Sequence, residues 1–340
     1  MARPTVKMKG TLLLDDDSRS VARAAAIIRQ GGLVAFPTET VYGLGAAATD
    51  PGAVKKIFAA KGRPYDNPLI VHLSGIEQLS AVALNVPEAA FTLVEKFWPG
   101  PLSLVLFRSK KIPPEVSAGL PTVAVRMPDH PVALNLIEAA GVPVAAPSAN
   151  RSGLPSPTDY RHVLKDLAGF IDAVIKSDVC EIGVESTVLD LTGPAPVILR
   201  PGGLSREKLE EALGRTVGLA ALTGAGDKPL SPGMKYRHYS PLAPMILVVG
   251  PLKRRRPLLK ALVRSFKRKG LKVGLLNISL QHHLIRNSDP GHLAARLYGT
   301  LRRLDAEGVD LILAEETETA GLGLAVMNRL RRAATRVIKT

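Results

Sequence analysis

Short apolar runs alternate with helical segments over the first two thirds of the chain. Seven runs rich in Val, Ile and Leu have the length of strands and are bounded by polar, Gly or Pro residues. They are Leu33–Phe36, Leu69–Leu73, Leu102–Phe107, Thr122–Arg126, Val142–Ala145, Ser186–Leu191 and Val197–Arg200. A helix is predicted from Asp50, which caps it, through Pro51 at its first position, to a stop at Gly62. The pattern predicts an α/β domain.

Strand and helix alternate more regularly in the last hundred residues. We expect strands over Met245–Val249, Lys272–Asn277 and Asp310–Ala314, and helices over Leu258–Lys269, Leu293–Ala306 and Leu322–Ala333. This order is typical of a small open parallel sheet with helices on both faces.

A segment without periodicity separates the two parts. Residues 217–244 hold four Gly and four Pro among 28 residues, a composition that favours a linker. We therefore expect a first domain over 15–216, a linker over 217–243 and a C-terminal domain over 244–340.

Composition excludes disorder and points to an anionic partner. Hydrophobic residues make up 46% of the 340 residues and charged residues 22%, the balance of a packed globular chain. The formal charge is +15, from 45 Lys and Arg against 30 Asp and Glu. Residues 1–243 hold 26 basic and 23 acidic groups (+3), and residues 244–340 hold 19 and 7 (+12). A nucleotide or RNA is the expected partner.

A single cysteine, Cys180, excludes an intramolecular disulfide and any multi-cysteine zinc or iron–sulfur site. We expect a reducing, cytoplasmic compartment. The most apolar stretch, Pro241–Leu252, is about half the length of the roughly 20-residue helix that spans a membrane. The first residues lack the apolar core of a signal peptide, and we expect no secretion.

Polar motifs directly follow the predicted strands, where open α/β sheets bind ligands. They are FPTETVYGLG from Phe36, KGRP from Lys61, NPLIVH from Asn67, TVAVRMP from Thr122, APSAN from Ala146, GVESTV from Gly183 and LRPGG from Leu199. The common nucleotide cradles, the HExxH zinc motif and the GxSxG nucleophile motif are absent from the sequence. A nucleotide would therefore bind outside those cradles.

Each motif residue also has a structural interpretation. Lys61 and Arg63 could satisfy carbonyl groups at a helix end, and Thr40 and Ser148 could be turn residues. Asn150 could cap its own loop and His72 could be a packed histidine. Arg126 is harder to explain in this way, since a buried guanidinium needs a carboxylate or phosphate partner.

Taken together, these motifs closely resemble those of the YrdC-like threonylcarbamoyl-adenylate synthases. The resemblance covers about residues 20–215, and SPGMKYRHYSP from Ser231 and GLGLAVMNRL from Gly321 are similar to the long archaeal and eukaryotic form. It implies an α/β fold with a twisted, open, mixed N-terminal sheet, helices and a large cavity. It also implies a smaller, Rossmann-like parallel α/β domain at the C-terminus.

The resemblance implies a nucleotidyltransferase that makes L-threonylcarbamoyl-AMP from L-threonine, bicarbonate or CO2, and ATP, with release of pyrophosphate. The adenylate would supply a downstream transferase complex that modifies adenosine 37 of tRNAs reading ANN codons. Mg²⁺ would accompany ATP, with neither an organic cofactor nor a protein-built metal site. Since a carbamate formed from threonine and CO2 can attack the α-phosphorus directly, no enzymic nucleophile is required; positioning and charge neutralisation would suffice.

The resemblance also implies roles for individual residues. The amino-acid pocket would consist of Thr40, His72, Arg126, Ser186 and the backbone at Ala146. The reactive centre and triphosphate would be held by Lys61, Arg63, Ser148 and Asn150. Further ATP contacts would come from Asn67, Thr122, Ser156, Arg200 and Tyr236. In the linker, Lys235, Tyr236, Arg237 and His238 would form a lid, although a passive tether is the alternative.

Two other functions compete with this one. An RNA-binding module would use the positive charge, but most of that charge lies after residue 243, away from the motifs. Transfer of a plain carbamoyl group through a carbamoyl adenylate would not need Arg126 to hold an amino-acid carboxylate. The basic runs 253–256 and 267–269 could contact RNA directly or form a solvated face.

Overall fold

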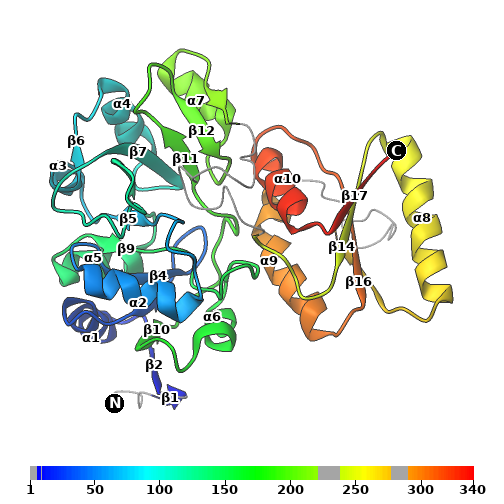
Figure 1. Cartoon of the computed structure of the whole chain (residues 1–340), viewed down its shortest axis with the longest axis horizontal. Helices are drawn as coiled ribbons and strands as arrows, with labels where there is room; N and C mark the ends of the chain where they lie inside the picture. The colour runs from blue at the N-terminus through cyan, green and yellow to red at the C-terminus, as the bar shows by residue number, and fades with distance from the viewer. Residues whose placement is uncertain (1–5, 9, 221–237, 277–289) are drawn as a thin grey trace. The chain divides into compact units, whose positions relative to one another are not determined.

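The computed structural model describes residues 6–8, 10–220, 238–276 and 290–340. The chain divides into two compact units, labelled by element in Figure 1. The first unit comprises residues 1–152 and 156–236, and the second comprises residues 153–155 and 237–340. In the described part of the chain, no helix is long and apolar enough to cross a membrane.

The first unit contains a mixed sheet. Its strands are β1 (Val6–Met8), β2 (Thr11–Leu14), β3 (Val34–Phe36), β4 (Gly43–Ala47), β5 (Ile70–His72), β6 (Ala83–Leu84), β7 (Leu102–Arg108), β8 (Thr122–Arg126), β9 (Val144–Ala145), β10 (Ala173–Ile175), β11 (Thr187–Asp190), β12 (Val197–Arg200) and β13 (Gly218–Leu219). The order along the sheet is β1-β2-β10-β3-β4-β9-β5-β8-β7-β11-β12-β13, and β6 pairs with β7. Pairing is parallel between β5 and β8 and antiparallel between β7 and β8. The predicted mixed α/β fold is confirmed.

Helices cover both faces of the central strands. They are α1 (Ser18–Arg29), α2 (Pro51–Lys61), a 3-10 turn η1 (Ile76–Gln78), α3 (Leu79–Val82), α4 (Glu88–Phe97), α5 (Pro131–Ala140), α6 (Tyr160–Leu167) and α7 (Arg206–Leu213). The side chains of β3 show the two layers, because Val34 and Phe36 pack with α1 and α5 whereas Ala35 packs with α2. Since apolar side chains pack on both faces, most polar side chains gather at or near strand ends.

Helix α2 has the predicted limits, and the predicted cap, proline and glycine determine them. The Asp50 carboxylate accepts hydrogen bonds from the N–H groups of Gly52 and Ala53, and Pro51 occupies the first turn. Gly62 ends the helix in the left-handed region, at φ 60°. Lys61 is therefore the last residue of the helix, at the start of the KGRP loop.

Strand β4 is absent from the sequence prediction because it contains two glycines, which are depleted in strands. The structure shows why glycine is needed. A Cβ atom at Gly45 would lie 2.8 Å from the Phe36 ring and 2.8 Å from the Val144 side chain. The glycine lets the backbone of β4 approach those side chains closely.

The second unit is a parallel sheet of four strands. In order they are β15 (Val273–Leu276), β16 (Leu311–Glu315), β14 (Met245–Val249) and β17 (Arg336–Lys339). Figure 1 shows α8 (Leu252–Arg268) on one face and α9 (Pro290–Ala306) and α10 (Leu322–Ala333) on the other. The predicted small parallel sheet with helices on both faces is confirmed. The expected start of the first helix at Leu258 is wrong, since α8 begins six residues earlier and contains Pro257.

The end of the predicted linker packs within the second unit. The Tyr239 ring is buried and stacks on Tyr298, with 5.5 Å between the ring centroids. The Arg329 guanidinium lies over the same ring, 5.3 Å from its centroid. Tyr239 belongs to SPGMKYRHYSP and Arg329 to GLGLAVMNRL, so the two C-terminal motifs meet here. Most of the predicted linker, residues 221–237 with Lys235, Tyr236 and Arg237, lies outside the described residues.

We expect Tyr239→Ala to destabilise the second unit by about 3 kcal/mol, since it removes a buried aromatic ring and a cation–π contact. Urea unfolding should be followed by far-UV circular dichroism, which reports both units, and by the fluorescence of Trp98, the sole tryptophan, which lies in the first unit. Only the dichroism transition should move to lower urea. Tyr239→Phe, which keeps the ring, is the control; equal stability of Tyr239→Ala and Tyr239→Phe would contradict the assignment.

Candidate functional site

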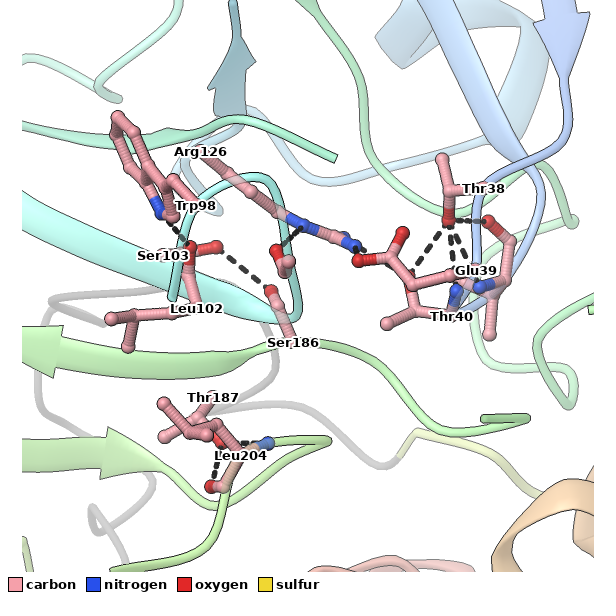
Figure 2. Close-up of polar contacts among 12 residues, drawn as sticks. Thr38, Glu39, Thr40, Trp98, Leu102, Ser103, Arg126, Ser186, Thr187 and Leu204 are labelled. Carbon is pink, nitrogen blue, oxygen red and sulfur yellow. Dashed lines mark hydrogen bonds and ion pairs between the residues drawn. The ribbon is translucent and has the colours of Figure 1, made fainter. Parts of the chain in front are cut away.

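The guanidinium of Arg126 is the centre of a buried polar cluster at the end of β8. Figure 2 shows its side chain pointing toward the loop that follows β3. Nη2 forms an ion pair with Glu39 at 2.5 Å, Nη1 donates to the Thr40 hydroxyl at 3.0 Å, and Nε donates to the Gly100 carbonyl at 3.1 Å. Arg126 is 3% exposed and Glu39 is 6% exposed. The chain itself therefore supplies the expected carboxylate partner of Arg126.

Thr40 is both a turn residue and a member of this cluster. The Thr38 hydroxyl donates to the Val41 carbonyl at 2.7 Å and accepts from the backbone N–H groups of Thr40 and Val41. The only hydroxyl proton of Thr38 is already donated to the Val41 carbonyl. The Thr40 hydroxyl is therefore the donor in the 2.8 Å contact between the two hydroxyls. Its oxygen accepts from Arg126, so the hydroxyl orientation of Thr40 is fixed.

Glu39 has no role in the sequence prediction, although it stands in the first motif. Apart from the ion pair with Arg126, neither of its carboxylate oxygens accepts a hydrogen bond from any residue that the structure describes. A buried carboxylate with unused acceptors can receive N–H groups from a ligand. The sequence signal for it was indirect, since a buried Arg126 requires an acid and Glu39 is the acid in FPTETVYGLG.

Ser186 and Arg200 form the other side of the same cluster (Figure 2 shows Ser186 with Ser103). The hydroxyls of Ser186 and Ser103 are 2.8 Å apart. Arg200 Nη2 donates to the Ser186 hydroxyl at 3.2 Å and to its carbonyl at 2.9 Å. Ser103 was not predicted, because it lies inside a strand and its partner is 83 residues away in sequence. Arg200, expected at ATP, thus lies beside a residue expected at the amino acid.

His72 lies beside Arg126 because β5 and β8 pair in parallel with these two residues in register. Its ring is buried, and Nδ1 donates to the Ile70 carbonyl at 3.2 Å. Burial, together with the positive charge of Arg126, lowers the pKa of His72 from 6.5 to about 3. The imidazole is neutral at physiological pH. The N–H of Ala146 donates to the same carbonyl at 2.9 Å, so only the Ala146 carbonyl remains for a substrate.

A second cluster joins the end of α2 to the APSAN motif. The ammonium group of Lys61, which is 3% exposed, donates to the Ser148 carbonyl and, at 2.5 Å, to the Asn150 carbonyl. The Ser148 hydroxyl donates to the Asn150 side-chain oxygen at 2.6 Å. These hydrogen bonds of Lys61 reach another loop rather than the last carbonyls of its own helix. The structural interpretation of Lys61 as a helix-end group therefore does not account for them.

Arg63 shapes the adjoining loop. Its Nε donates to the Asn67 carbonyl at 3.1 Å and its Nη2 to the Pro68 carbonyl at 2.8 Å. The amide side chain of Asn67 is 1% exposed, and neither its nitrogen nor its oxygen has a hydrogen-bond partner among the described residues. A buried amide without partners is costly unless a ligand or water satisfies it. Asn67 is thus the predicted residue with the most evident unused binding capacity.

The two clusters are connected through the loop that follows Thr40. Gly43 pairs with Ser148 as an antiparallel bridge, and the N–H of Ala149 donates to the Tyr42 carbonyl at 2.8 Å. The loop that orients Thr40 is therefore tied directly to the APSAN loop. This connection brings the residues expected for the amino acid and for the phosphates into one region.

Three further predicted residues are Ser156, Thr122 and Tyr236. Ser156 is buried and donates to Glu185 at 2.5 Å. Thr122 begins β8 whereas Arg126 ends it, so their Cα atoms are about 13 Å apart along an extended strand. Tyr236 lies outside the described residues.

The described residues offer no group of three or more His, Cys, Asp or Glu side chains that could hold a metal ion. The buried thiol of Cys180 is also poorly suited to act as a nucleophile. Burial raises the pKa of the Cys180 thiol to about 12, which keeps it protonated. The site consists of cationic side chains, the Glu39 carboxylate, hydroxyls, amides and carbonyls, a set suited to binding and orienting charged ligands.

Comparison with known families accounts for nearly the whole chain. The Sua5, YciO and YrdC family model, described as "Telomere recombination", matches residues 26–202. The model described as "Threonylcarbamoyl-AMP synthase, C-terminal domain" matches residues 204–335. The resemblance inferred from the motifs is confirmed.

Individual relatives agree over both units. The chain is 51% identical to a threonylcarbamoyl-AMP synthase of Pyrococcus abyssi, covering 93% of this chain and 94% of that one. It is 46% identical to the Bacillus subtilis protein of the same name, with 94% of each covered. The crystal structure of P. abyssi Sua5 complexed with L-threonine superposes with a TM-score of 0.90 at 47% identity, covering 97% of this chain and 100% of that one.

We expect His72 not to titrate between pH 5 and pH 8, because its pKa of about 3 lies below that range. The imidazole proton resonances, assigned by their loss in His72→Gln, should keep constant shifts. Since unfolded histidine binds a proton near pH 6.5, this residue's contribution to folding is complete above 6.5 and decreases as the pH falls toward 3. The stability of His72→Gln should thus fall less steeply on acidification. A titration midpoint near 6.5 would refute the burial argument.

Proposed function

The chain belongs to the Sua5/YrdC family of threonylcarbamoyl-AMP synthases, and on that premise we propose that it makes L-threonylcarbamoyl-AMP from L-threonine, bicarbonate or CO2, and ATP, releasing pyrophosphate. The observation that carries this proposal is the buried Arg126 cluster. A guanidinium, two hydroxyls and a carboxylate with unused acceptors converge there, a donor and acceptor set matching an amino acid. The L-threonine complex of a relative with a TM-score of 0.90 supports the same assignment.

In the proposed amino-acid pocket, Arg126 holds the carboxylate of threonine. The guanidinium of Arg126 also pairs with Glu39. The substrate carboxylate shares this guanidinium with Glu39 or replaces Glu39 as its partner. The carboxylate oxygens of Glu39 then accept hydrogen bonds from the amine of threonine. The hydroxyls of Thr40 and Ser186, with neutral His72 and the Ala146 carbonyl, complete the pocket and distinguish threonine from amino acids without a hydroxyl group.

In the proposed nucleotide site, permanent cations neutralise the phosphates. Lys61 and Arg63 supply the charge, and Ser148, Asn150 and Asn67 supply hydrogen bonds. Further contacts are assigned from the family motifs to Thr122, Ser156, Arg200 and Tyr236. Mg²⁺ would enter with ATP as part of the substrate and would reduce the negative charge of the phosphates.

The chemistry needs no group of the chain to become covalently bound. The threonine amine adds to CO2, loses a proton and becomes a carbamate. A carbamate oxygen then attacks the α-phosphorus of ATP, forming the new P–O bond as the bond to the β-phosphate oxygen breaks and pyrophosphate leaves. Holding the two reactants in line contributes on the order of 7–11 kcal/mol to such a reaction. The protonated Cys180 thiol is consistent with this scheme.

The product is an activated acyl donor for a further reaction. We propose that it supplies threonylcarbamoyl groups to a separate transferase complex acting on adenosine 37 of tRNAs that read ANN codons, in the cytoplasm. We also propose, from the sequence, that Lys235, Tyr236, Arg237 and His238 form a lid that closes on the substrates, with Tyr236 reaching ATP. Of these four residues only His238 is described, and it lies in the second unit.

Pyrophosphate release from ATP and bicarbonate, measured with each amino acid in turn, tests the proposed function. We expect release that depends on L-threonine and falls at least tenfold with valine, which lacks the hydroxyl. The product mass identifies the adenylate. Release with carbamoyl phosphate in place of threonine would instead favour the carbamoyl alternative, and the absence of release with any amino acid would favour an RNA-binding module.

We expect Arg126→Lys to raise the KM for threonine at least tenfold while leaving the KM for ATP within about twofold, because a lysine cannot form the forked contact with a carboxylate. Arg161→Lys, at an exposed guanidinium that pairs with Asp159, is the matched control and should have the same KM values as the parent chain. Trp98 fluorescence confirms that each variant is folded. An unchanged KM for threonine in a folded Arg126→Lys protein would remove Arg126 from the pocket.

A further inference from the structure

The most unusual surface outside the site is the helix α8 of the second unit. Its 17 residues contain eight Lys or Arg side chains and not a single Asp or Glu. Lys269 and Lys272 follow directly after it. The proposed synthesis of threonylcarbamoyl-AMP gives this charge no role, since the family motifs for that reaction lie elsewhere.

One face of α8 is fully used in folding. Leu259 is buried, and Leu262 and Phe266 pack with it against strands β14, β15 and β16. Arg255 is the one helix cation of α8 with an ion pair in the described chain, at 3.1 Å from Glu315. The helix is therefore held in place by its apolar face, and most of its cations are not required for that contact.

Five of the seven other cations of α8 form a line along its exposed side. Five exposed residues recur at intervals of three or four, which places them on one side of an α-helix: Lys253, Arg256, Lys260, Arg264 and Lys267. We call these five residues the basic stripe. With a rise of 1.5 Å per residue, the stripe is about 21 Å long and presents one cation for each turn of the helix.

The stripe is not neutralised within the described part of the chain. None of its five side chains forms an ion pair or hydrogen bond there, whereas Arg303 and Arg331 in the same unit pair with Glu307 and Glu316. Like charges at this spacing repel one another by a few tenths of a kcal/mol per pair. A bound polyanion would neutralise these cations and relieve the repulsion between them. The stripe is therefore complementary to a polyanion with regularly spaced charges.

We propose that the basic stripe of α8 is a docking surface for the phosphate backbone of folded RNA. A nucleic-acid backbone carries one negative charge per nucleotide, so a straight row of cations can contact successive phosphates. The choice of RNA over DNA rests on the proposed function, whose product is destined for tRNA. The proposed contact with a phosphate backbone does not depend on that function, because it follows from the geometry and charge of α8 alone.

Two other kinds of partner fit the surface less well. A helix that lies in a membrane surface inserts its apolar face into lipid, but the apolar face of α8 is already packed on the sheet. Protein interfaces centre on aromatic or apolar anchors, and the stripe contains none. A phosphate backbone requires neither feature.

The test measures binding of the full-length protein to a fluorescently labelled RNA hairpin by anisotropy, at several salt concentrations. The stripe variant is Lys253→Gln, Lys260→Gln, Arg264→Gln and Lys267→Gln in one chain. The control variant carries Lys96→Gln, Lys110→Gln, Lys165→Gln and Arg215→Gln, four exposed cations of the first unit, and loses the same net charge. Threonine-dependent pyrophosphate release is assayed in parallel.

We expect the stripe variant to bind RNA at least tenfold more weakly than the control variant. The slope of log K against log salt should become shallower by about three to four, since four phosphate contacts are lost. Pyrophosphate release should be equal in both variants. Failure of the proposed function would show as absent release in the unaltered protein, whatever the RNA result.

Several results would overturn the proposal. Equal loss of RNA binding in the two variants would show that overall charge, not the stripe, attracts RNA. Absence of RNA binding by the unaltered protein would also end it. Tighter binding of a duplex DNA of the same sequence, or of anionic lipid vesicles, would assign the surface to another polyanion.

Discussion

The ion pair between Arg126 and Glu39 is the interaction on which the architecture of the site depends. A guanidinium that is 3% exposed would be intolerable without a counter-charge, because its desolvation costs several kcal/mol. The chain satisfies it with the carboxylate of Glu39, the hydroxyl of Thr40 and the carbonyl of Gly100. These three partners come from two loops at the end of the sheet. A substrate carboxylate that engages Arg126 must therefore rearrange an existing network instead of entering an empty one.

Both faces of the central strands are covered by helices, and this determines where such a network can form. Val34 and Phe36 on one face and Ala35 on the other are all buried. Most polar side chains of the site consequently lie at or near strand ends and in the loops beyond them. The Gly43–Ser148 bridge then ties the two groups of loops together, so that a binding region arises from the sheet topology.

Local sequence signals predict the limits of α2, but they do not predict contacts between residues far apart in the chain. The limits of α2 followed from Asp50, Pro51 and Gly62, since a cap, a fixed φ and a left-handed residue act within one turn. Strand β4 is not predicted from the sequence, because its glycines are explained only by the side chains of Phe36 and Val144 that pack against it. The α8 start was misplaced because Pro257 usually marks a helix start, yet here it lies inside.

The same distinction applies to the site. The motifs predicted that Arg126 needs an acid, but which acid it contacts depends on a pairing across 87 residues of sequence. The role of Ser103 could not be predicted for the same reason. Only the parallel pairing of β7 and β11 brings it next to its partner Ser186. Family motifs identify residues, whereas the register of the sheet decides which of them meet.

Two buried ionisable groups, His72 and Cys180, do not change charge near neutral pH. Burial lowers the pKa of His72 to about 3 and raises that of Cys180 to about 12. Arg63 and Arg126 are guanidinium groups, which stay protonated in proteins. The guanidinium groups and the oriented dipoles of the site present a constant field of fixed positive charge. That field suits reactants that bring their own nucleophile and their own leaving group, because stabilising charge already present costs no reorganisation during the reaction.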